Sequence, residues 1–549
     1  MAFQNWKEIE PDQKAMTLSR EKNLSSIEAM IVSRLLHPSL EPAFFSGEPL
    51  VFPASSSLPD IARAAERIAL AARNGEKILV HGDYDTDGLM GTAVMVSGLT
   101  ALGASVAAFV PSRFDDGYGL SAASVEAAKK QNARLMVTVD CGTNAGDIEK
   151  ALALNGIDLV VSDHHIPEEN NLVKGIIVNP HFGESEEMKT LAGATVGYLL
   201  LRETAAVMGV PLPEEPFLRL CAIATISDVV PVSPFNWKLC REGFRTLAGT
   251  RSPGLTALLE KCPQPPFRSH HIAYYLAPRL NAAGRMEDGN LVLEILLERD
   301  QERARLLVDK LEALNKSRRF TQNQMAEEVE KHFDAESDIA FLFCASDRFH
   351  KGLLGPVASR LAQERGICVF LIAVEGENAT GSARAADGCD ITALLRRSEG
   401  IFTRLGGHQK AAGFTMQTKN ISKLRDFLDN NLTKNADPET SRMEYFLLKP
   451  DQAELAWNSL GGLDPIDHSL QPPYFAFELA SLSDARVVKD KHLLWNIQLP
   501  GGYSFSAFYF DAFTKIKEVP SRDRTIVGRL LPDKIKTRPN FFFEVKDII

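Results

Sequence analysis

The chain has 549 residues, of which 45% are hydrophobic and 24% charged, and its formal net charge is −10. This length predicts about three or four domains. The negative net charge excludes a protein whose whole surface is basic, although a local basic groove could still bind nucleic acid. Because the chain has no signal-like N-terminus and no apolar run of about 18 residues, we expect a cytoplasmic protein without a membrane anchor. Its seven cysteines include no Cys-x-x-Cys pair, so we expect neither a disulfide framework nor a structural zinc site.

The first 249 residues divide into a short helical segment and an α/β region. Residues 1–45 are polar and then helical, with Ser25 and Glu28 spaced as a capping box, and we interpret them as a packing segment. In residues 46–249, short β-branched apolar strands alternate with helices. This pattern predicts a parallel sheet.

Three of the predicted strands end in aspartate or histidine. Strand 77–80 leads into His81-Gly82-Asp83-Tyr84-Asp85-Thr86-Asp87-Gly88, strand 135–139 into Asp140, and strand 157–161 into Asp163-His164-His165. In open α/β sheets, sites form at the carboxyl ends of the strands, so we expect these side chains to lie close together. Asp228, which closes the apolar helical run 217–226, is a further candidate.

The turn 81–88 holds three aspartates and a histidine within seven positions of one another. A bound cation would neutralise the repulsion among its carboxylates. For this turn alone, a solvated acidic loop or an Asx-rich turn is the alternative. The coincidence of three such strand ends favours the metal site.

Residues 250–440 predict a connector followed by a second α/β unit. A long charged stretch, 291–332, has leucines on one helical face and predicts a helix that spans two domains. Strand-like runs at 339–343 and 367–372 belong to the second unit. We interpret Gly381-Ser382-Ala383-Arg384 and Gly406-Gly407-His408 as glycine-rich loops, in which backbone can approach a phosphate and Arg384 can pair with it.

Residues 441–549 are rich in aromatics and strand patterns and show little helix pattern, with a hairpin signal at Gly501-Gly502. The stretch 515–538 carries eight lysines and arginines against three acidic residues. A small β-barrel with a basic edge and aromatic faces would suit single-stranded nucleic acid. A charged β-surface without a ligand is the alternative.

Together, the strand-end motifs resemble those of the DHH phosphoesterase family, whose name describes Asp163-His164-His165. The resemblance extends to the RecJ exonucleases of that family and covers the chain from about residue 46 to its end. It includes the segments 113–120, 279–285, 381–384 and 406–408. The resemblance implies an α/β protein with a parallel-sheet DHH domain (46–249), a helical connector (250–335), a DHH-associated accessory domain (336–440) and an OB-like barrel (441–549).

The resemblance also implies two divalent metal ions bridged by Asp140. His81 and Asp85 would hold one ion, and Asp87, His164 and Asp228 the other. Imidazoles among carboxylates suit Mn²⁺ better than Mg²⁺, which prefers oxygen ligands and is the second candidate. His165 would contact the scissile phosphate. Asp163 and Asp83 would orient histidines, or else simply form turns.

Substrate-binding residues follow from the same resemblance. They are Arg113, Tyr118, Arg279, Asn281, Ser382, Arg384 and His408. We expect Arg113, Ser382 and Arg384 to bind a 5′-terminal phosphate and Tyr118 to stack on the terminal base. The alternatives are a surface salt bridge for Arg113 and simple packing for Tyr118.

The activity implied is a single-strand-specific 5′-to-3′ DNA exonuclease that hydrolyses phosphodiester bonds by a two-metal mechanism, in DNA repair and recombination. We expect a monomer that binds single-stranded DNA, with a single-strand-binding protein and a helicase as candidate partners. Two alternatives stay open: a DHH phosphodiesterase on short oligonucleotides or cyclic dinucleotides, and a catalytically inactive DNA-binding subunit. The long connector and C-terminal barrel argue against the first, and the retained ligands against the second. The N-terminal segment and residues 461–475 depart from the RecJ pattern.

Overall fold

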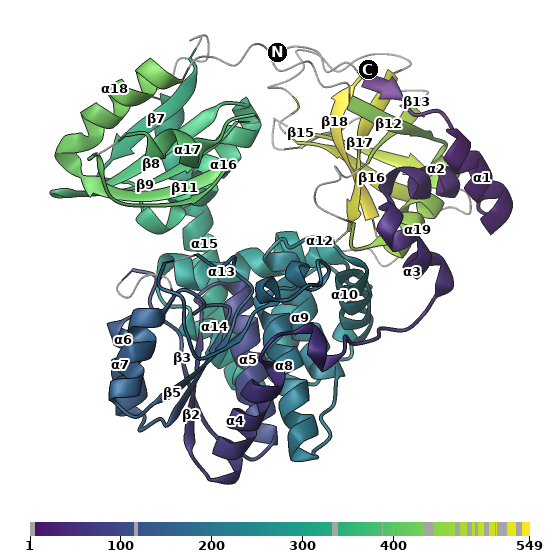
Figure 1. The fold of residues 1–549 in the computed structure, drawn as a ribbon. Coiled ribbons are helices and arrows are strands. Elements are labelled where there is room, and N and C mark those ends of the chain that lie inside the picture. Colours follow the sequence, from purple (N-terminus) through teal and green to yellow (C-terminus); the bar gives the residue numbers. More distant parts are fainter. Residues whose placement is uncertain are drawn as a thin grey trace. The chain divides into compact units, whose positions relative to one another are not determined.

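The computed structural model of the chain describes residues 6–114, 119–168, 170–331, 339–386, 388–398, 400–432, 443–466, 473–479, 486–488, 492–498, 504–510, 512, 524–533 and 541–549. The chain forms two compact units. The first comprises residues 1–284, 288–309 and 442–549, and the second comprises 285–287 and 310–441. The long helix predicted within 291–332 is α15 (Gln301–Lys331), which continues from the first unit into the second (Figure 1).

The first unit contains the predicted parallel sheet, in the strand order β3-β2-β4-β5-β6 with every pair parallel. The strands are β2 (Lys77–Gly82), β3 (Ser105–Phe109), β4 (Leu135–Val139), β5 (Asp158–Ser162) and β6 (Ile176–Val178). Every residue of β4 is buried, as expected for a sheet with helices on both faces. Helices α6 and α7 lie on one face and α4, α5 and α8 on the other (Figure 1).

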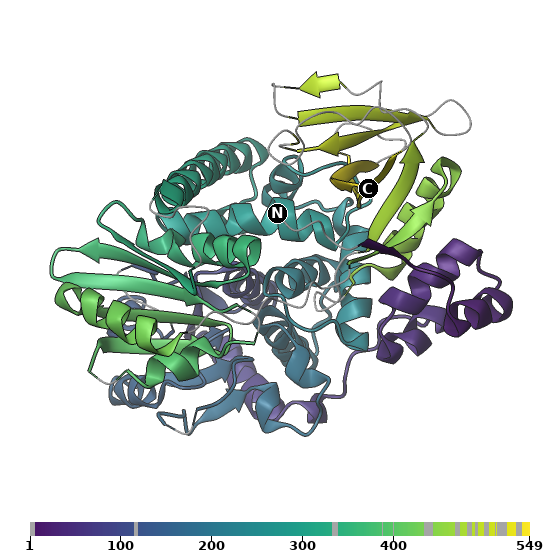
Figure 2. The same ribbon diagram turned by 90° about the horizontal axis from the view of Figure 1, so that it is seen from above.

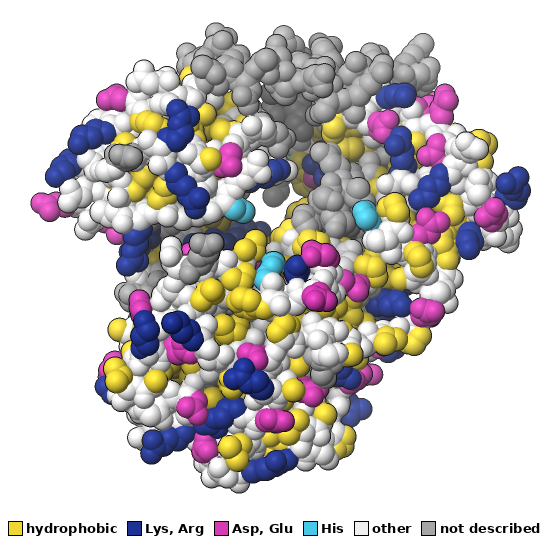
Figure 3. Space-filling view, viewed as in Figure 1, with side chains coloured by type: hydrophobic (Ala, Val, Ile, Leu, Met, Phe, Trp, Pro, Cys, Tyr) yellow, Lys and Arg dark blue, Asp and Glu magenta, His cyan; other side chains and the backbone are white. Residues whose placement is uncertain are grey.

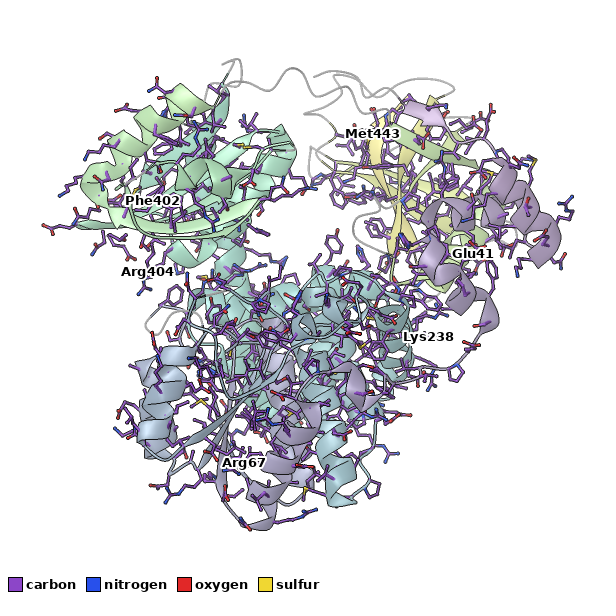
Figure 4. The ribbon with its side chains drawn as sticks, viewed as in Figure 1. Glu41, Arg67, Lys238, Phe402, Arg404 and Met443 are labelled. Atoms are coloured by element: carbon purple, nitrogen blue, oxygen red, sulfur yellow. The ribbon has the colours of Figure 1, made fainter. Side chains whose placement is uncertain are left out.

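The helices of this region are α4 (Ile61–Arg73), α5 (Thr86–Ala101), α6 (Ala122–Lys130), α7 (Gly146–Leu154), α8 (Gly193–Met208), α9 (Glu215–Ser227), α10 (Pro234–Leu247), α11 (Pro253–Leu259), α12 (Ser269–His271), α13 (Ala277–Met286) and α14 (Asn290–Leu297). Arg67, labelled in Figure 4, joins α4 to the sheet: its Nε donates to Asp158 Oδ2 at 2.7 Å and its Nη2 to Glu76 Oε2 at 2.8 Å. These contacts lie at the end of the sheet opposite the carboxyl ends of the strands.

The second unit is built on a five-stranded sheet in the order β10-β11-β9-β8-β7. Its strands are β7 (Phe341–Ser346), β8 (Cys368–Glu375), β9 (Asn378–Arg384), β10 (Phe402–His408) and β11 (Ala411–Gln417), and its helices besides α15 are α16 (Leu354–Arg365), α17 (Ile391–Arg396) and α18 (Ile421–Asn431). One core lies between the sheet and α17 and α18, and another between the sheet and α15 and α16. The predicted α/β character of residues 339–432 is confirmed.

The prediction of glycine-rich loops in this unit is wrong. Gly381 to Arg384 lie in β9, and Gly406 to His408 in β10. Glycine in a strand often marks a close approach of neighbouring atoms. A Cβ on Gly381 would lie 2.1 Å from the ring of Phe414 on the paired strand β11, so the missing side chain makes room for that ring.

The C-terminal residues form a β-rich region together with the N-terminal segment. The strands are β1 (Trp6–Glu8), β12 (Met443–Leu448), β13 (Tyr474–Leu479), β14 (Arg486–Val488), β15 (His492–Gln498), β16 (Ser504–Tyr509), β17 (Arg524–Pro532) and β18 (Phe541–Ile548). Their order is β1-β12-β13-β17-β18-β16-β15-β14, and among the described residues no pairing joins β1 to β14, so closure into an OB-like barrel is not confirmed. The antiparallel pair β15–β16 fits the predicted hairpin, whose Gly501-Gly502 lies outside the described residues.

The N-terminal helices share one hydrophobic core with these strands. They are α1 (Gln13–Lys22), α2 (Ser26–Leu35) and α3 (Glu41–Ser46), and Figures 1 and 2 both show them beside the C-terminal strands. The capping box is present: Glu28 N donates to Ser25 Oγ, and Ser25 N to Glu28 Oε2. Helix α19 (Ala453–Leu463) lies in a region where we expected little helix, although its apolar residues Ala453, Ala456, Trp457 and Leu460 have helical spacing. No helix in the described residues is long and apolar enough to cross a membrane.

Candidate metal centre

Asp83 and Asp85 lie in the turn from β2 into α5, and Asp87 lies in the first turn of that helix. Asp85 is the N-cap of α5, and its Oδ1 accepts a hydrogen bond from Gly88 N at 3.1 Å. The carboxylate of Asp87 is buried and accepts from Gly193 N at 2.7 Å and Ala194 N at 2.8 Å, the first amides of α8. A helix N-terminus stabilises an anion in this way.

Asp140 follows β4 in the left-handed conformation, with φ of 63°. A Cβ on Gly193 would lie only 2.6 Å from both Cβ and Oδ1 of Asp140, so a glycine is needed there for the start of α8 to approach this carboxylate. Oδ1 of Asp140 and Oδ1 of Asp83 are both buried without a hydrogen-bond partner. Buried carboxylate oxygens without donors are costly, and a cation would satisfy them.

His164 presents one ring nitrogen to three carboxylates. Its Nδ1 donates to Leu191 O at 2.9 Å, so Nε2 is the ring nitrogen that faces the carboxylates. Nε2 lies 3.1 Å from Asp140 Oδ1, 3.6 Å from Asp228 Oδ2 and 3.8 Å from Asp87 Oδ2. Asp228 is the C-cap residue of α9. A neutral imidazole held by a backbone carbonyl is the usual form of a metal-binding histidine.

The ligand atoms gather into overlapping groups whose members lie within 4.8 Å of one another. One group is Asp87, His164 and Asp228, a second is Asp83, Asp85 and Asp140, and a third is Asp140, His164 and His165. Asp140 and His164 each belong to two of them, and Oδ1 of Asp140 lies 3.1 Å from Nε2 of His164, so Asp140 lies between the first group and the second, where a bridging ligand would be expected. The donor set of carboxylate oxygens and one imidazole nitrogen fits two adjacent divalent ions of the Mn²⁺ or Mg²⁺ type.

Without a cation, burial and mutual repulsion disfavour the charged forms of several of these carboxylates and raise their pKa values. Burial, and then the charges of Asp87 and Asp85, raise the pKa of Asp140 well above its usual range. The same causes raise the pKa of Asp228 to about 8, and burial followed by the charge of Asp85 raises the pKa of Asp83. Protons and metal ions therefore compete for this cluster.

The structure does not bring His81 into the cluster. Its ring is buried, with Nε2 2.9 Å from Ser124 Oγ and Nδ1 3.6 Å from Cys141 Sγ. Asp83, which we predicted to orient a histidine, instead lies beside Asp85 and Asp140. We therefore replace His81 by Asp83 in the candidate ligand set.

Asp163 orients His165. The Nδ1–H of His165 donates to Asp163 Oδ1 at 2.8 Å, while Thr143 N donates to Asp163 Oδ2 at 3.0 Å. Burial alone would raise the pKa of Asp163, but the hydrogen bond and charge of His165 lower it to about 2. Burial alone would lower the pKa of His165, but Asp163 raises it to about 9. In the metal-free protein these contacts favour the protonated form of His165 at neutral pH, and its Nδ1 donates to Asp163.

We expect the metal-free protein to become less stable as pH rises. Between the ordinary pKa of 3.8 and about 8, folded Asp228 holds a proton that the unfolded chain lacks, so the free energy of unfolding falls as pH increases. His165 acts in the same direction from about pH 6.5 to 9. Thermal unfolding in EDTA at about pH 7.5, 8.2 and 9 should show a falling Tm, since the buried histidines with a lowered pKa, such as His81 and His270, act in the opposite direction mainly below about pH 6.5. The fall should be smaller in Asp228→Asn; an equal or larger fall in that variant would contradict the assignment.

Two of the predicted substrate residues of the first unit, Arg113 and Asn281, contact the acidic turn, whereas Arg279 contacts its own helical stretch. The guanidinium of Arg113 lies 5.3 Å from the ring centroid of Tyr84, between Asp83 and Asp85 in sequence. Asn281 Oδ1 accepts from Thr86 N at 3.1 Å, and Arg279 Nη1 donates to Tyr275 O at 2.5 Å. The prediction for Tyr118 falls outside the described residues.

The predicted substrate residues of the second unit lie on strands β9 and β10, on either side of β11. Arg384 donates from Nη1 to Ser382 Oγ at 2.9 Å and from Nε to Ser359 Oγ at 2.8 Å. His408 pairs with Ala411, and Ala411 with Arg384, so His408 and Arg384 lie in one row of the sheet. A Cβ on Gly355 would lie 2.7 Å from Arg384 Nη2, which places this guanidinium against the first turn of α16.

Comparison with known proteins identifies the family of the chain. Residues 77–225 match the DHH family N-terminal domain, and residues 338–434 match the DHHA1 domain. The single-stranded-DNA-specific exonuclease RecJ of Salmonella typhimurium is 31% identical over 81% of this chain and 82% of its own length. The chain belongs to the RecJ family. The RecJ-family resemblance of the motifs is thereby confirmed.

Other RecJ-family members match over most of this chain. RecJ of Thermus thermophilus is 32% identical over 80% of it, although the match spans only 65% of the Thermus protein. The crystal structure of Thermus thermophilus RecJ in complex with Mn²⁺ superposes with a TM-score of 0.80 at 26% identity, covering 99% of this chain and 79% of that one. The chain therefore spans less than two thirds of the length of that relative by sequence.

Proposed function

We propose that this chain is a single-strand-specific 5′-to-3′ DNA exonuclease that hydrolyses phosphodiester bonds with two divalent metal ions, in DNA repair and recombination. The observation that carries the proposal is the cluster of Asp83, Asp85, Asp87, Asp140, His164 and Asp228, which includes two buried carboxylate oxygens without donors. The names of the RecJ relatives support the substrate.

In this proposal, Asp87, His164 and Asp228 would hold one ion, Asp83 and Asp85 would hold the other, and Asp140 would be shared between them. Such ions, when bound, activate a water molecule and stabilise the leaving oxygen of the phosphodiester. Mn²⁺ is favoured because an imidazole lies among the carboxylates, and Mg²⁺ is the second choice. Asp163 holds His165 as a cation directed at the scissile phosphate, where charge develops in the transition state.

The C-terminal β-rich region is proposed to supply affinity for single strands. Its described strands carry aromatic residues, including Tyr474, which packs against the guanidinium of Arg529 at 4.4 Å. We retain the OB-like barrel as a proposal for this region, while most of the basic stretch 515–538 lies outside the described residues. A monomer acting on cytoplasmic DNA, with a single-strand-binding protein and a helicase as partners, completes the proposal.

The test is an exonuclease assay on matched strands labelled at the 5′ or the 3′ end, single or paired, with Mn²⁺, Mg²⁺ or EDTA. A 5′-labelled single strand should release labelled mononucleotide at once, whereas a 3′-labelled strand should shorten gradually. Duplex and EDTA reactions should be inactive. Hydrolysis of dinucleotides but not of long strands would favour the short-substrate phosphodiesterase, and binding without hydrolysis would favour an inactive subunit.

We expect Arg384→Ala to reduce the preference for a 5′-phosphate. Charge-assisted hydrogen bonds from a guanidinium to phosphate are strong, so the ratio of kcat/KM for 5′-phosphorylated over 5′-hydroxyl single strands should fall about tenfold. Arg384→Lys should retain part of the preference. Arg348, an exposed arginine paired with Glu328 in the same unit, provides the control variant Arg348→Ala. An unchanged ratio in Arg384→Ala would remove Arg384 from the proposed phosphate site.

A further inference from the structure

A single π-helical turn, Ile272–Leu276, separates α12 from α13 in the first unit. π-Helical turns are rare and occur frequently at functional sites. Tyr274, in the middle of this turn, has 66% of its surface exposed. Figure 3 shows hydrophobic side chains, with a histidine among them, on the surface over α12 and α13. Neither the metal centre nor the predicted phosphate site uses Tyr274.

The ring of Tyr274 is supported from one side. It stacks on the imidazole of His270, with centroids 4.5 Å apart and an angle of 29° between the planes. His270 also lies 5.9 Å from the ring of Tyr275. Burial, followed by the charge of His271, lowers the pKa of His270 to about 4, so the supporting ring is neutral at physiological pH. A ring held in place before binding loses little conformational entropy when it stacks on a ligand.

The same helical stretch reaches the metal centre. Arg279 Nη1 donates to the carbonyl of Tyr275, and Asn281 Oδ1 accepts from Thr86 N in the turn that carries Asp85 and Asp87. Seven residues separate Tyr274 from Asn281, which corresponds to about 10 Å along a helix. Tyr274 therefore lies about two helical turns from Asn281, whose amide contacts the turn beside the acidic cluster, which is a distance that a few nucleotides span.

We propose that Tyr274, stacked on His270, is a platform for one base of the single strand next to the metal centre. Every base has a π-face, so an exposed aromatic ring binds bases without regard to sequence, as an exonuclease requires. Arg279 lies on the same stretch to pair with the backbone phosphate of that nucleotide. This inference rests on the proposed function and adds a base-binding subsite to it.

The test compares binding of a 5′-phosphorylated oligothymidylate with binding of an abasic strand of the same length and charge, by fluorescence anisotropy in EDTA. Tyr274→Ala should weaken binding of the oligothymidylate about tenfold and leave the abasic strand unchanged. Tyr274→Phe, which keeps the ring, should bind like wild type. Phe320→Ala removes a ring of similar exposure, 64%, from α15 and is the matched control.

A scan with 2-aminopurine at successive positions locates the base. Wild type should quench one position near the 5′ end, and Tyr274→Ala should restore that fluorescence. Equal binding of both strands by wild type and Tyr274→Ala would overturn the platform, as would equal losses on both strands. If wild type binds and degrades single strands while these variants do not differ, only the platform fails; if wild type does neither, the proposed function fails.

Discussion

Asp140→Asn is expected to abolish hydrolysis while leaving the metal-free protein at least as stable as wild type. Asp140 belongs to the group with Asp83 and Asp85, and its Oδ1 lies 3.1 Å from His164 Nε2 of the other proposed site, so its loss should weaken the binding of both ions. Metal ions contribute several kcal/mol to transition-state stabilisation, and the rate should fall by roughly 10³ or more. Asparagine is the suitable replacement because it tolerates the left-handed conformation of this residue.

Thermal unfolding of Asp140→Asn, with EDTA and with Mn²⁺, distinguishes loss of metal binding from loss of the fold. Burial and the charges of Asp87 and Asp85 raise the pKa of Asp140, so a neutral amide removes repulsion from the apo cluster. Tm in EDTA should equal or exceed that of wild type, and the increase in Tm on adding Mn²⁺ should shrink. Asp147→Asn, an exposed aspartate in the first turn of α7, should behave as wild type. Normal turnover by folded Asp140→Asn would refute the two-metal assignment.

His165→Ala is expected to lose most of the hydrolytic rate and to keep its metal. Nδ1 of His165 is occupied by Asp163 at 2.8 Å and lies 3.9 Å from Asp140 Oδ1, so this atom is poorly placed to serve as a ligand. A cation directed at a developing phosphate charge is typically worth about 10²–10³ in rate. Single-turnover hydrolysis should fall by that factor, while calorimetric affinity for Mn²⁺ stays within about threefold.

Asp163→Asn provides a second measurement of the same role. It keeps the side-chain shape but removes the charge that raises the pKa of His165. His165 should then lose its proton nearer its ordinary pKa of 6.5, and the variant's rate should decline from about pH 7 upward, where wild type still holds a cation. If His165→Ala no longer binds Mn²⁺, His165 is a ligand and this role is wrong.

The sequence by itself determined the parallel sheet and the edge at which the candidate site forms. Continuous apolar strands such as 135–139 have both faces buried, and the carboxyl ends of parallel strands meet at one edge. The motifs that follow β2, β4 and β5 therefore lie together at that edge of the sheet. The capping box at Ser25 and the long helix α15 were also predictable, because their signals lie within a few residues of one another.

The tertiary structure alone decided which side chains of these motifs meet. His81 and Asp83 are two residues apart, yet His81 turns toward Ser124 on α6 while Asp83, beyond the strand, reaches Asp85 and Asp140. The direction of a side chain at a strand end depends on the turn and on its neighbours, which local pattern does not record.

Other features that the sequence did not reveal also depend on contacts between segments far apart in the chain. Gly381 lies in a strand, where the ring of Phe414 fills the space of its missing side chain. Strand β1 pairs with β12, more than 430 residues later in the chain. The approach of α8 to Asp140 depends on Gly193, far from Asp140 in sequence. Such contacts between distant segments depend on packing, and packing exists only once the chain has folded.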